Sequence, residues 1–183
     1  GSHRLWKKEL IDLMNIQKNE TIVDIGSGTG DLINLILNLK KNNSIYAVDL
    51  NSEMLQYSKK RHTNKNVTFI KANAEKLPFN NNSIDKYIIS FCLRNVTDID
   101  NALKESYRIL KPGGVFYCLE FSSPESSLIK KLYNQYKKKI IPWVGSKVAK
   151  NKEAYKYLEE SIDQFPNQKK LILTLSIYKN LVL

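Results

Sequence analysis

Apolar residues occur along this chain in short runs separated by turn-forming polar residues, and these runs predict a sheet. β-Branched and aromatic residues dominate the runs, as expected for strands that are covered on both faces. Five strands are predicted, over 22–25, 44–49, 67–70, 87–91 and 115–119.

Apolar residues three and four positions apart predict helices between these strands. In an N-terminal helix the apolar face would consist of Trp6, Leu10, Leu13 and Met14. Further helices are predicted over 32–39, 52–61, 103–110 and 129–140. Strands that alternate with helices indicate an α/β fold, a mostly parallel sheet with helices on both faces. No repeat or low-complexity linker is visible, so 1–183 is predicted to form a single domain.

A glycine-rich turn follows the first predicted strand. Gly26, Gly28 and Gly30 allow a sharp turn and a close approach of the backbone to a ligand, and the free N–H groups of the next helix lie beside them. A dinucleotide fingerprint would place a further glycine at Asp31, whose carboxylate would repel a pyrophosphate. A P-loop would need Gly-Lys-Ser/Thr, which is absent here. The turn therefore favours a ligand without phosphate, such as S-adenosylmethionine.

Acidic residues stand at the ends of the first two strands. Asp24 lies at the tip of the first, next to its last residue, and Asp49 closes the second, where a carboxylate can accept hydrogen bonds from the two ribose hydroxyls of an adenosine. The alternative for Asp49 is a turn or a cap of the 52–61 helix. After the third strand, Asn73 and Ala74 would face the adenine edge.

Composition indicates a globular protein, with 183 residues, 42% hydrophobic residues and a net charge of +11. The positive charge comes from 25 Lys and 4 Arg, and scarce Arg argues against nucleic-acid recognition. Cys92 and Cys118 lie in apolar runs and are predicted to be reduced core thiols. His3 and His62 have no partner at metal-ligand spacing, so no metal is expected.

Six sequence blocks follow one another in a characteristic order. They are Asp-Ile-Gly-Ser-Gly-Thr-Gly-Asp at 24–31, Val-Asp-Leu-Asn at 48–51, Ala-Asn-Ala-Glu-Lys-Leu-Pro-Phe at 72–79, Leu-Arg-Asn-Val-Thr-Asp at 93–98, Arg-Ile-Leu-Lys-Pro-Gly-Gly at 108–114 and Leu-Glu-Phe-Ser at 119–122. Together they strongly resemble the UbiE/COQ5 family of class I methyltransferases, which C-methylate the quinol ring in ubiquinone and menaquinone synthesis. The resemblance covers roughly residues 3–168.

This resemblance implies a Rossmann-like fold, S-adenosyl-L-methionine as methyl donor and S-adenosyl-L-homocysteine as product. It adds Thr29 and Ser90 to the residues singled out above. The predicted cofactor-binding residues are Asp24, Gly26, Gly28, Thr29, Gly30, Asp49, Asn73, Ala74 and Ser90. The implied acceptor is a polyprenyl benzoquinol of the 2-methoxy-6-polyprenyl-1,4-benzoquinol type, with a demethylmenaquinone precursor as the alternative.

Arg94 and Asn95 lie in the block that the family places beside the substrate ring. A ring carbon becomes nucleophilic when a hydroxyl ortho or para to it is deprotonated. A permanently charged guanidinium suits the resulting phenolate, so Arg94 is predicted to stabilise it electrostatically. An Arg acting as general base would need an exceptional pKa shift. Asn95 would hold a water or the second ring oxygen. The structural alternative is a salt bridge and a turn at this strand exit.

Several positions depart from the family pattern. Ser27 and Cys92 stand where the family commonly has glycine, and Cys92 would reshape the substrate entrance. Gly1, His3-Arg4 and Trp6-Lys7 match the family's start, so a natural N-terminal segment is expected to precede them. The residues 169–183 are too few for the helix and closing strand pair that the family carries, so the C-terminus is expected to be truncated or to lack a stretch.

Other functions stay open from sequence. They are a methyltransferase acting on RNA or another small molecule, and a cofactor-binding scaffold of a quinone-biosynthesis complex. Expected partners are the prenylated quinol, such a complex or a second copy of the chain, and a membrane surface touched by the lysines at 137–139 and the apolar residues 140–144. The compartment would be the matrix side of the mitochondrial inner membrane in a eukaryote and the cytoplasm in a bacterium.

Overall fold

A computed structural model describes residues 2–121 and 181–182 of the chain. The chain divides into two compact units, one comprising 1–120 with 175–183 and the other 121–174. Apart from Phe121, the second unit lies outside the described residues, as do the predicted 129–140 helix and the proposed membrane segment. The expectation of a single domain therefore stays a prediction.

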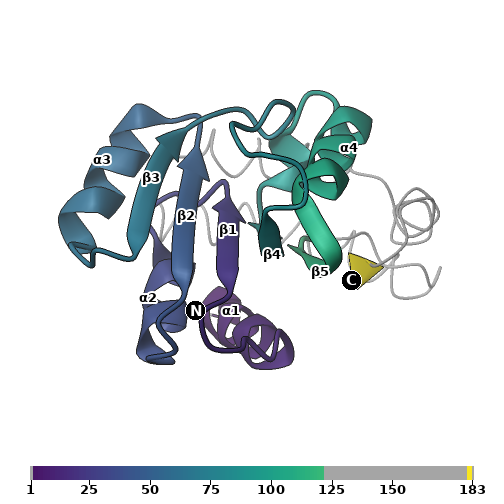
Figure 1. Cartoon of the computed structure of the whole chain (residues 1–183). Helices are drawn as coiled ribbons and strands as arrows, with labels where there is room; N and C mark the ends of the chain where they lie inside the picture. Colours follow the sequence, from purple (N-terminus) through teal and green to yellow (C-terminus); the bar gives the residue numbers. More distant parts are fainter. Residues whose placement is uncertain (1, 122–180, 183) are drawn as a thin grey trace, which may run out of the picture. The chain divides into compact units, whose positions relative to one another are not determined.

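The first unit is built around one sheet with strand order β3-β2-β1-β4-β5-β6 (Figure 1). Every pairing between the described strands is parallel, which confirms the predicted sheet. The chain runs outward from β1 to β3 and then returns to place β4 on the other side of β1. The strands are β1 Thr21–Ile25, β2 Ser44–Asp49, β3 Val67–Lys71, β4 Ile84–Ser90, β5 Leu110–Leu119 and β6 Leu181–Val182.

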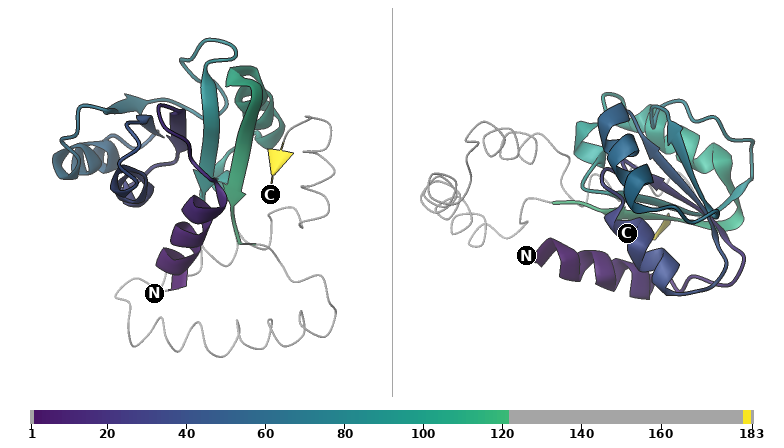
Figure 2. Two further views of the ribbon diagram at one scale, coloured as in Figure 1. Left: turned by 60° about the horizontal axis from the view of Figure 1, so that its bottom comes forward. Right: turned by 90° about the vertical axis from the view of Figure 1, so that its left-hand side faces the viewer.

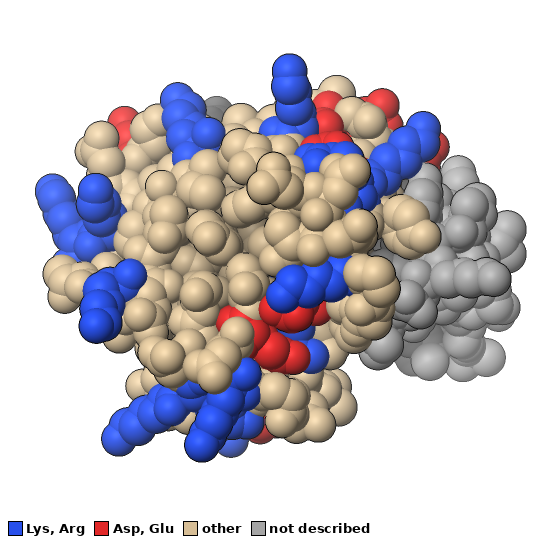
Figure 3. All heavy atoms as spheres, viewed as in Figure 1, with Lys and Arg blue, Asp and Glu red and all other residues tan. Residues whose placement is uncertain are grey.

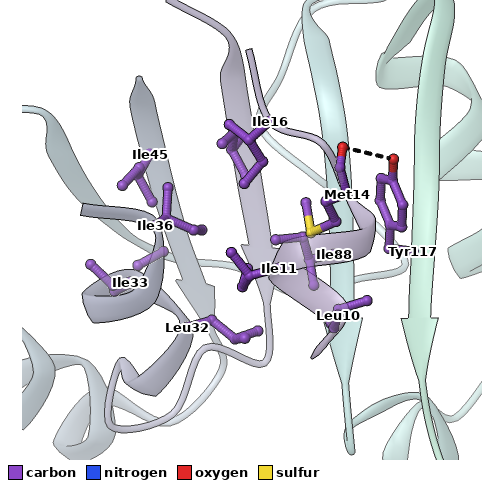
Figure 4. Close-up of a cluster of buried hydrophobic side chains, with 12 residues drawn as sticks. Leu10, Ile11, Met14, Ile16, Leu32, Ile33, Ile36, Ile45, Ile88 and Tyr117 are labelled. Atoms are coloured by element: carbon purple, nitrogen blue, oxygen red, sulfur yellow. Dashed lines mark hydrogen bonds between the residues drawn. The ribbon is translucent and has the colours of Figure 1, made fainter. Parts of the chain in front are cut away.

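Helices cover both faces of this sheet, as the sequence predicts (Figure 2). The α-helices are α1 Ser2–Leu13, α2 Asp31–Asn38, α3 Ser52–Arg61 and α4 Ile99–Ile109, with a short 3₁₀-helix η1 over Leu93–Asn95. One face carries α1 and α2, whose buried side chains form a cluster with residues of β1, β2, β4 and β5. Figure 4 shows this cluster, in which the Tyr117 hydroxyl donates a hydrogen bond of 3.3 Å to the Met14 carbonyl. The helix α4 lies on the opposite face (Figure 2).

The apolar face predicted for α1 is rotated in the structure. Leu10, Ile11 and Met14 are buried, whereas Leu13 is 73% exposed and Trp6 is 40% exposed. Successive helical residues differ by about 100° in direction, so a face centred between Leu10 and Ile11 turns Leu13 towards solvent. The prediction was therefore right for Leu10 and Met14 and wrong for Leu13.

The predicted boundary between the fourth helix and the fifth strand was also wrong. The helix α4 ends at Ile109, Leu110 already belongs to β5, and Tyr107 is exposed. Ile84 pairs with Leu110, but Lys86 pairs with Val115, so the Pro-Gly-Gly turn bulges out within β5. The turn interrupts the strand and does not precede it.

Candidate functional site

The carboxyl ends of β1, β2, β3 and β4 surround a pocket of about 360 Å³. A pocket of this size falls within the range of about 300–1,000 Å³ that is usual for small-molecule sites. Its walls come from the segments after four different strands. They are Ile25, Gly26, Gly28, Asp49, Leu50, Asn51, Met54, Ala72, Asn73, Ala74, Glu75, Phe91, Cys92, Asn95, Val96 and Thr97.

Five of the nine predicted cofactor-binding residues line this pocket, namely Gly26, Gly28, Asp49, Asn73 and Ala74. The structure thus brings together residues that are far apart in the sequence, because β1 lies between β2 and β4. Of the two predicted catalytic residues, Asn95 lines the pocket and Arg94 is not among the lining residues. The binding and catalytic roles themselves stay predictions.

The remaining four predicted cofactor residues lie around the glycine turn and the tips of β1 and β4. Asp24 is the penultimate residue of β1, Ser90 is the last residue of β4, and Gly30 precedes α2. Thr29 presents its carbonyl to Arg61, whose Nη1 donates a hydrogen bond of 3.0 Å to it. None of the four is among the pocket-lining residues.

The glycine turn packs too tightly for side chains at two of its positions. A Cβ on Gly26 would lie 2.2 Å from Sγ of Cys92, and a Cβ on Gly30 would lie 2.4 Å from Oγ of Ser58. Both glycines also have positive φ angles, of 67° and 81°. The turn can therefore lie directly against the β4 exit on one side and against α3 on the other.

Asp49 connects the tip of β2 to the glycine turn. Its Oδ2 accepts a hydrogen bond of 2.8 Å from the Gly28 N–H, and its Oδ1 accepts one of 2.8 Å from the Asn51 N–H. The cap of α3 is made by Asn51, which accepts hydrogen bonds from Glu53 and Met54. Asp49 thus shapes the turn, which is the structural role that the sequence offered as an alternative to ribose binding. Each carboxylate oxygen still has a further lone pair for a ligand hydroxyl.

The buried polar atoms that have no hydrogen-bond partner within the described part of the chain include Oδ2 of Asp24 and Oγ of Ser90, near the pocket. Both residues lie on the same face of adjacent strands, since Asp24 pairs with Ile88 and Ser90 is two residues further along β4. Buried acceptors of this kind are normally satisfied. They fit a ligand that brings its own donors, such as the ammonium group of S-adenosylmethionine.

The charge of Asp24 depends on its surroundings. Burial raises the pKa of Asp24 to about 7, while the charge of Lys7 lowers it in part and the carboxylates of Asp49 and Asp31 raise it further. A cationic ligand beside this group would favour its ionised form.

Asp31 links the glycine turn to two other helices. Its Oδ2 lies 3.3 Å from Nζ of Lys7 in α1, and its Oδ1 lies 3.6 Å from Nη1 of Arg61 in α3. Partial burial acts to raise the pKa of Asp31, but the Lys7 charge, the Lys7 hydrogen bond and the Arg61 charge outweigh it and hold the pKa below its usual value. Asp31 therefore ties α1 and α3 to the start of α2.

Arg94 forms a buried ion pair with Glu120. Its Nη1 donates to Oε1 of Glu120, and its backbone N–H donates a hydrogen bond of 3.3 Å to Oε2. The two side chains are 9% and 4% exposed. The salt bridge and turn that the sequence offered as a structural alternative are thus both present, because Glu120 holds η1 to the end of β5. The exposed neighbour Asn95 reaches the pocket wall.

Sequence reasoning missed the residues that hold the pocket loops together. Oε1 of Glu75 accepts hydrogen bonds of 3.1 Å from the N–H groups of both Thr97 and Asp98, which joins the loop after β3 to the loop after β4. Glu105 in α4 accepts a hydrogen bond of 2.8 Å from the Leu77 N–H. The family-specific block at 72–79 contains Glu75 and could have drawn attention to it. An acid that accepts hydrogen bonds from backbone N–H groups of another loop is needed to keep the two loops in one arrangement.

The two cysteines are free thiols, as predicted, but both are only half-buried. Cys92 lines the pocket, so its assignment as a core residue was wrong. Burial raises the pKa of Cys92 to about 11, and the nearby carboxylates of Asp49 and Asp24 contribute. The thiol is therefore protonated near neutral pH.

His62 has a structural role. Its ring nitrogens lie 2.8 Å from the Ser58 carbonyl and 2.9 Å from Oδ1 of Asn34, so it joins α3 to α2. Within residues 2–121 and 181–182, no group of three or more metal-ligating side chains comes together. The same residues contain no helix long and apolar enough to span a bilayer.

Comparison with known sequences identifies the family. Residues 1–176 match the sequence model of the UbiE/COQ5 methyltransferase family. The chain belongs to this family. It is 48% identical over 177 residues to the ubiquinone/menaquinone biosynthesis C-methyltransferase UbiE of Rickettsia prowazekii, a match that covers 92% of the chain and 71% of the relative. The UbiE protein of Francisella tularensis subsp. mediasiatica is 42% identical over 176 residues, which cover 93% of the chain and 70% of the relative.

Membership in the UbiE/COQ5 family confirms the predicted enzyme class, a C-methyltransferase, and implies S-adenosylmethionine as methyl donor. A solved S-adenosylmethionine-dependent methyltransferase from Aquifex aeolicus shares the fold, with a TM-score of 0.66 and 18% identity. That match covers 94% of this chain and 78% of the Aquifex chain. The Rossmann-like fold predicted for the chain is thereby confirmed.

Proposed function

We propose that this UbiE/COQ5 family member methylates a ring carbon of a polyprenyl benzoquinol of the 2-methoxy-6-polyprenyl-1,4-benzoquinol type, in ubiquinone biosynthesis. The observation that carries the proposal is the pocket at the strand tips, which Gly28, Asp49 and Asn95 help to line. The relatives of the chain carry ubiquinone and menaquinone biosynthesis in their names. Because those names cover both quinones, a demethylmenaquinol acceptor is the second candidate.

The residues around the pocket suit S-adenosylmethionine. Asp49 offers lone pairs to ribose hydroxyls, Asn73 and Ala74 line the side where adenine would lie, and Asp24 offers a buried acceptor to the methionine end. The sulfonium of this cofactor supplies an electrophilic methyl group. The acidic side chains favour a cation there, and the close-packed glycine turn fixes the orientation of what binds against it.

The roles of Arg94 and Asn95 follow from their different positions. Asn95 lines the pocket and would hold a ring oxygen or a water beside it. Arg94 would favour the phenolate through its charge, but Glu120 offsets much of that charge. The Arg94 guanidinium is paired with Glu120 and Arg94 is not among the pocket-lining residues, which argues against Arg94 as the general base. We therefore assign direct contact with the ring oxygens to Asn95 and a supporting electrostatic role to Arg94.

The distribution of charge gives little support to an RNA substrate. On the face shown in Figure 3, many Lys and Arg side chains are spread around the edge, and those nearer the middle lie beside Asp and Glu side chains. A nucleic-acid site would gather positive charge along one path. Filter binding with RNA at rising salt tests this alternative, because phosphate contacts would give a steep salt dependence.

The two relatives are bacterial proteins. Of the two expected compartments, they therefore favour the cytoplasm of a bacterium over the mitochondrial inner membrane. Association with a quinone-biosynthesis complex, a second copy of the chain or a membrane surface stays a proposal. Flotation with anionic liposomes at low salt tests the membrane contact.

A turnover assay tests the proposed function. The protein is incubated anaerobically with isotopically methyl-labelled S-adenosylmethionine and reduced short-chain prenyl benzoquinol or demethylmenaquinol, and the quinones are examined by mass spectrometry. We expect labelled methyl on the ring of the benzoquinol, with slower transfer to the naphthoquinol. Binding of the donor without transfer to either ring would instead support a scaffold.

A further inference from the structure

Phe91 adopts a backbone conformation that is unusual for an aromatic residue. Directly after β4 its φ angle is 54°, in the left-handed region that glycine and asparagine occupy at lower cost. Its N–H donates a hydrogen bond of 2.7 Å to the Leu119 carbonyl, which fixes this conformation against β5. Strained residues of this kind concentrate at ligand sites.

Phe91 lines the pocket together with Cys92 and Asn95, and all three residues follow β4 in the chain. Trp6 of α1, which is not among the pocket-lining residues, packs against the Phe91 ring, with ring centroids 6.4 Å apart and an interplanar angle of 51°. This separation lies within the range of about 4.5–7 Å for interacting aromatic pairs. Trp6 is 40% exposed, so it is not a core residue of α1.

The position of Trp6 is fixed by its neighbour Lys7. Nζ of Lys7 lies 3.3 Å from Asp31, the first residue of α2, directly after the glycine turn. Further along, Leu10 and Ile11 of α1 and Met14, directly after the helix, are buried against the sheet. Trp6 therefore stands at a defined place beside the pocket.

We propose that Phe91 is a specificity-determining residue that stacks on the aromatic ring of the acceptor, and that Trp6 is the positioning residue that holds Phe91 in place. This inference rests on the proposed function and names how its acceptor is recognised. A flat, electron-rich ring is the ligand that an aromatic wall beside Asn95 would select, and the cofactor residues at β2 and β3 line the opposite side of the same pocket.

Four variants test the proposal. Phe91→Leu keeps an apolar side chain without an aromatic face, and Phe91→Gly removes the ring while relieving the backbone. Trp6→Leu removes the supporting ring. Tyr107→Leu is the matched control, because Tyr107 is an exposed aromatic residue of α4 and is not among the residues lining the pocket. Calorimetry with S-adenosylhomocysteine verifies that each variant is folded and binds the product.

We expect the Phe91 variants to raise the KM for the prenylated quinol about three- to tenfold, which is the value of one aromatic contact, with little change in kcat. Trp6→Leu should show a smaller rise in KM. Affinity for S-adenosylhomocysteine should stay within about twofold of the unaltered protein in all variants. Phe91→Tyr, which retains the aromatic face, should restore most of the acceptor affinity that Phe91→Leu loses.

A second measurement does not depend on turnover. With Trp143→Phe as background, Trp6 is the one remaining tryptophan, and an oxidised short-chain quinone is the probe. We expect saturable quenching of Trp6 fluorescence that Phe91→Leu weakens. The proposal is overturned if the Phe91 variants match Tyr107→Leu, or if acceptor KM and product affinity change in parallel. Absence of methyl transfer by the unaltered protein, with quenching intact, would overturn the proposed function and leave the aromatic site standing.

Discussion

The N–H of Gly28 donates a hydrogen bond of 2.8 Å to Oδ2 of Asp49, so the tip of the second strand directly shapes the turn after the first. Asp49→Asn would leave one amide oxygen to serve two backbone donors and would remove the negative charge. We expect affinity for S-adenosylhomocysteine to fall about tenfold or more, since hydrogen bonds to charged groups contribute about 1.5–3 kcal/mol. Calorimetry measures this loss.

Asp98→Ala is the control for that experiment. Asp98 caps α4 by accepting a hydrogen bond of 3.0 Å from the Asn101 N–H, and it is not among the pocket-lining residues. Loss of this cap should cost about 1 kcal/mol of unfolding free energy without weakening the ligand. Equal losses of affinity in both variants would contradict a binding role for Asp49.

Variants of the buried ion pair between Arg94 and Glu120 can distinguish its contribution to stability from its contribution to catalysis. Arg94→Met or Glu120→Gln leaves the opposite charge poorly compensated in a buried position, and each should lower the unfolding free energy by about 3–5 kcal/mol. The double variant Arg94→Met/Glu120→Leu removes both charges and should recover most of this loss. Urea denaturation of the three variants provides the comparison.

Activity of the same double variant then tests the role of Arg94. If its charge supports the phenolate, the double variant should bind S-adenosylhomocysteine normally and have a lower kcat. A double variant that keeps its kcat would show that the ion pair only holds η1 in place.

The raised pKa of Asp24 predicts how the unfolding free energy changes with pH. In the folded protein its pKa is raised to about 7, whereas in the unfolded chain it would be near the ordinary 3.8. Between these two pH values, Asp24 is therefore protonated more often in the folded state than in the unfolded state. Because of this difference, Asp24 makes the unfolding free energy fall as the pH rises from about 4 to 7. Asp24→Asn should remove this part of the slope, as thermal denaturation across that range would show.

Ligand binding should show the opposite trend. A cationic ligand binds better to ionised Asp24, so affinity for S-adenosylmethionine should rise with pH up to about 7 and then level off. Binding at pH 6 should release protons, which calorimetry in buffers of different ionisation enthalpy detects. A pH-independent affinity would mean that Asp24 does not contact the cation.

Gly30 and Gly113 offer a matched pair, because both have a φ angle of 81°. At Gly30 a Cβ would collide with Ser58 and His62, whereas at Gly113 nothing lies within 4 Å of it. Gly113→Ala should cost about 1–2 kcal/mol from backbone strain alone. Gly30→Ala should cost about 2–5 kcal/mol and weaken S-adenosylhomocysteine, since overpacking adds to the strain. Chemical denaturation distinguishes the two costs.

Much of the sheet could be predicted from the sequence, because buried parallel strands are continuous apolar runs bounded by turn residues. The run that became β2, Ser44–Asp49, was predicted with its true ends. Which side of α1 is buried could not be predicted, because Leu13 satisfies the helical spacing as well as Ile11 does, and the choice depends on the partner surface. The bulge in β5 likewise depends on pairing with Ile84.

At the site, residues next to strand ends were predictable and tertiary contacts were not. Asp49 and Gly28 follow from the position of acids and glycines after strands. The family-specific blocks contain Glu75 and Glu120 but do not reveal their partners, which lie more than twenty residues away in the sequence. The left-handed conformation of Phe91 also escaped prediction, since local propensity assigns an aromatic residue there to a strand.

The strand order has a consequence for synthesis. β1 pairs early with β2, but its other edge pairs with β4, which leaves the ribosome only after β2, α3 and β3. Until then an apolar central strand presents unpaired N–H and C=O groups, which is a template for association with other chains. A nascent chain that stops before Ile84 lacks all of β4, so it would expose this edge of β1 and lack the wall that Phe91, Cys92 and Asn95 build. Such a fragment is expected to aggregate and to bind no cofactor.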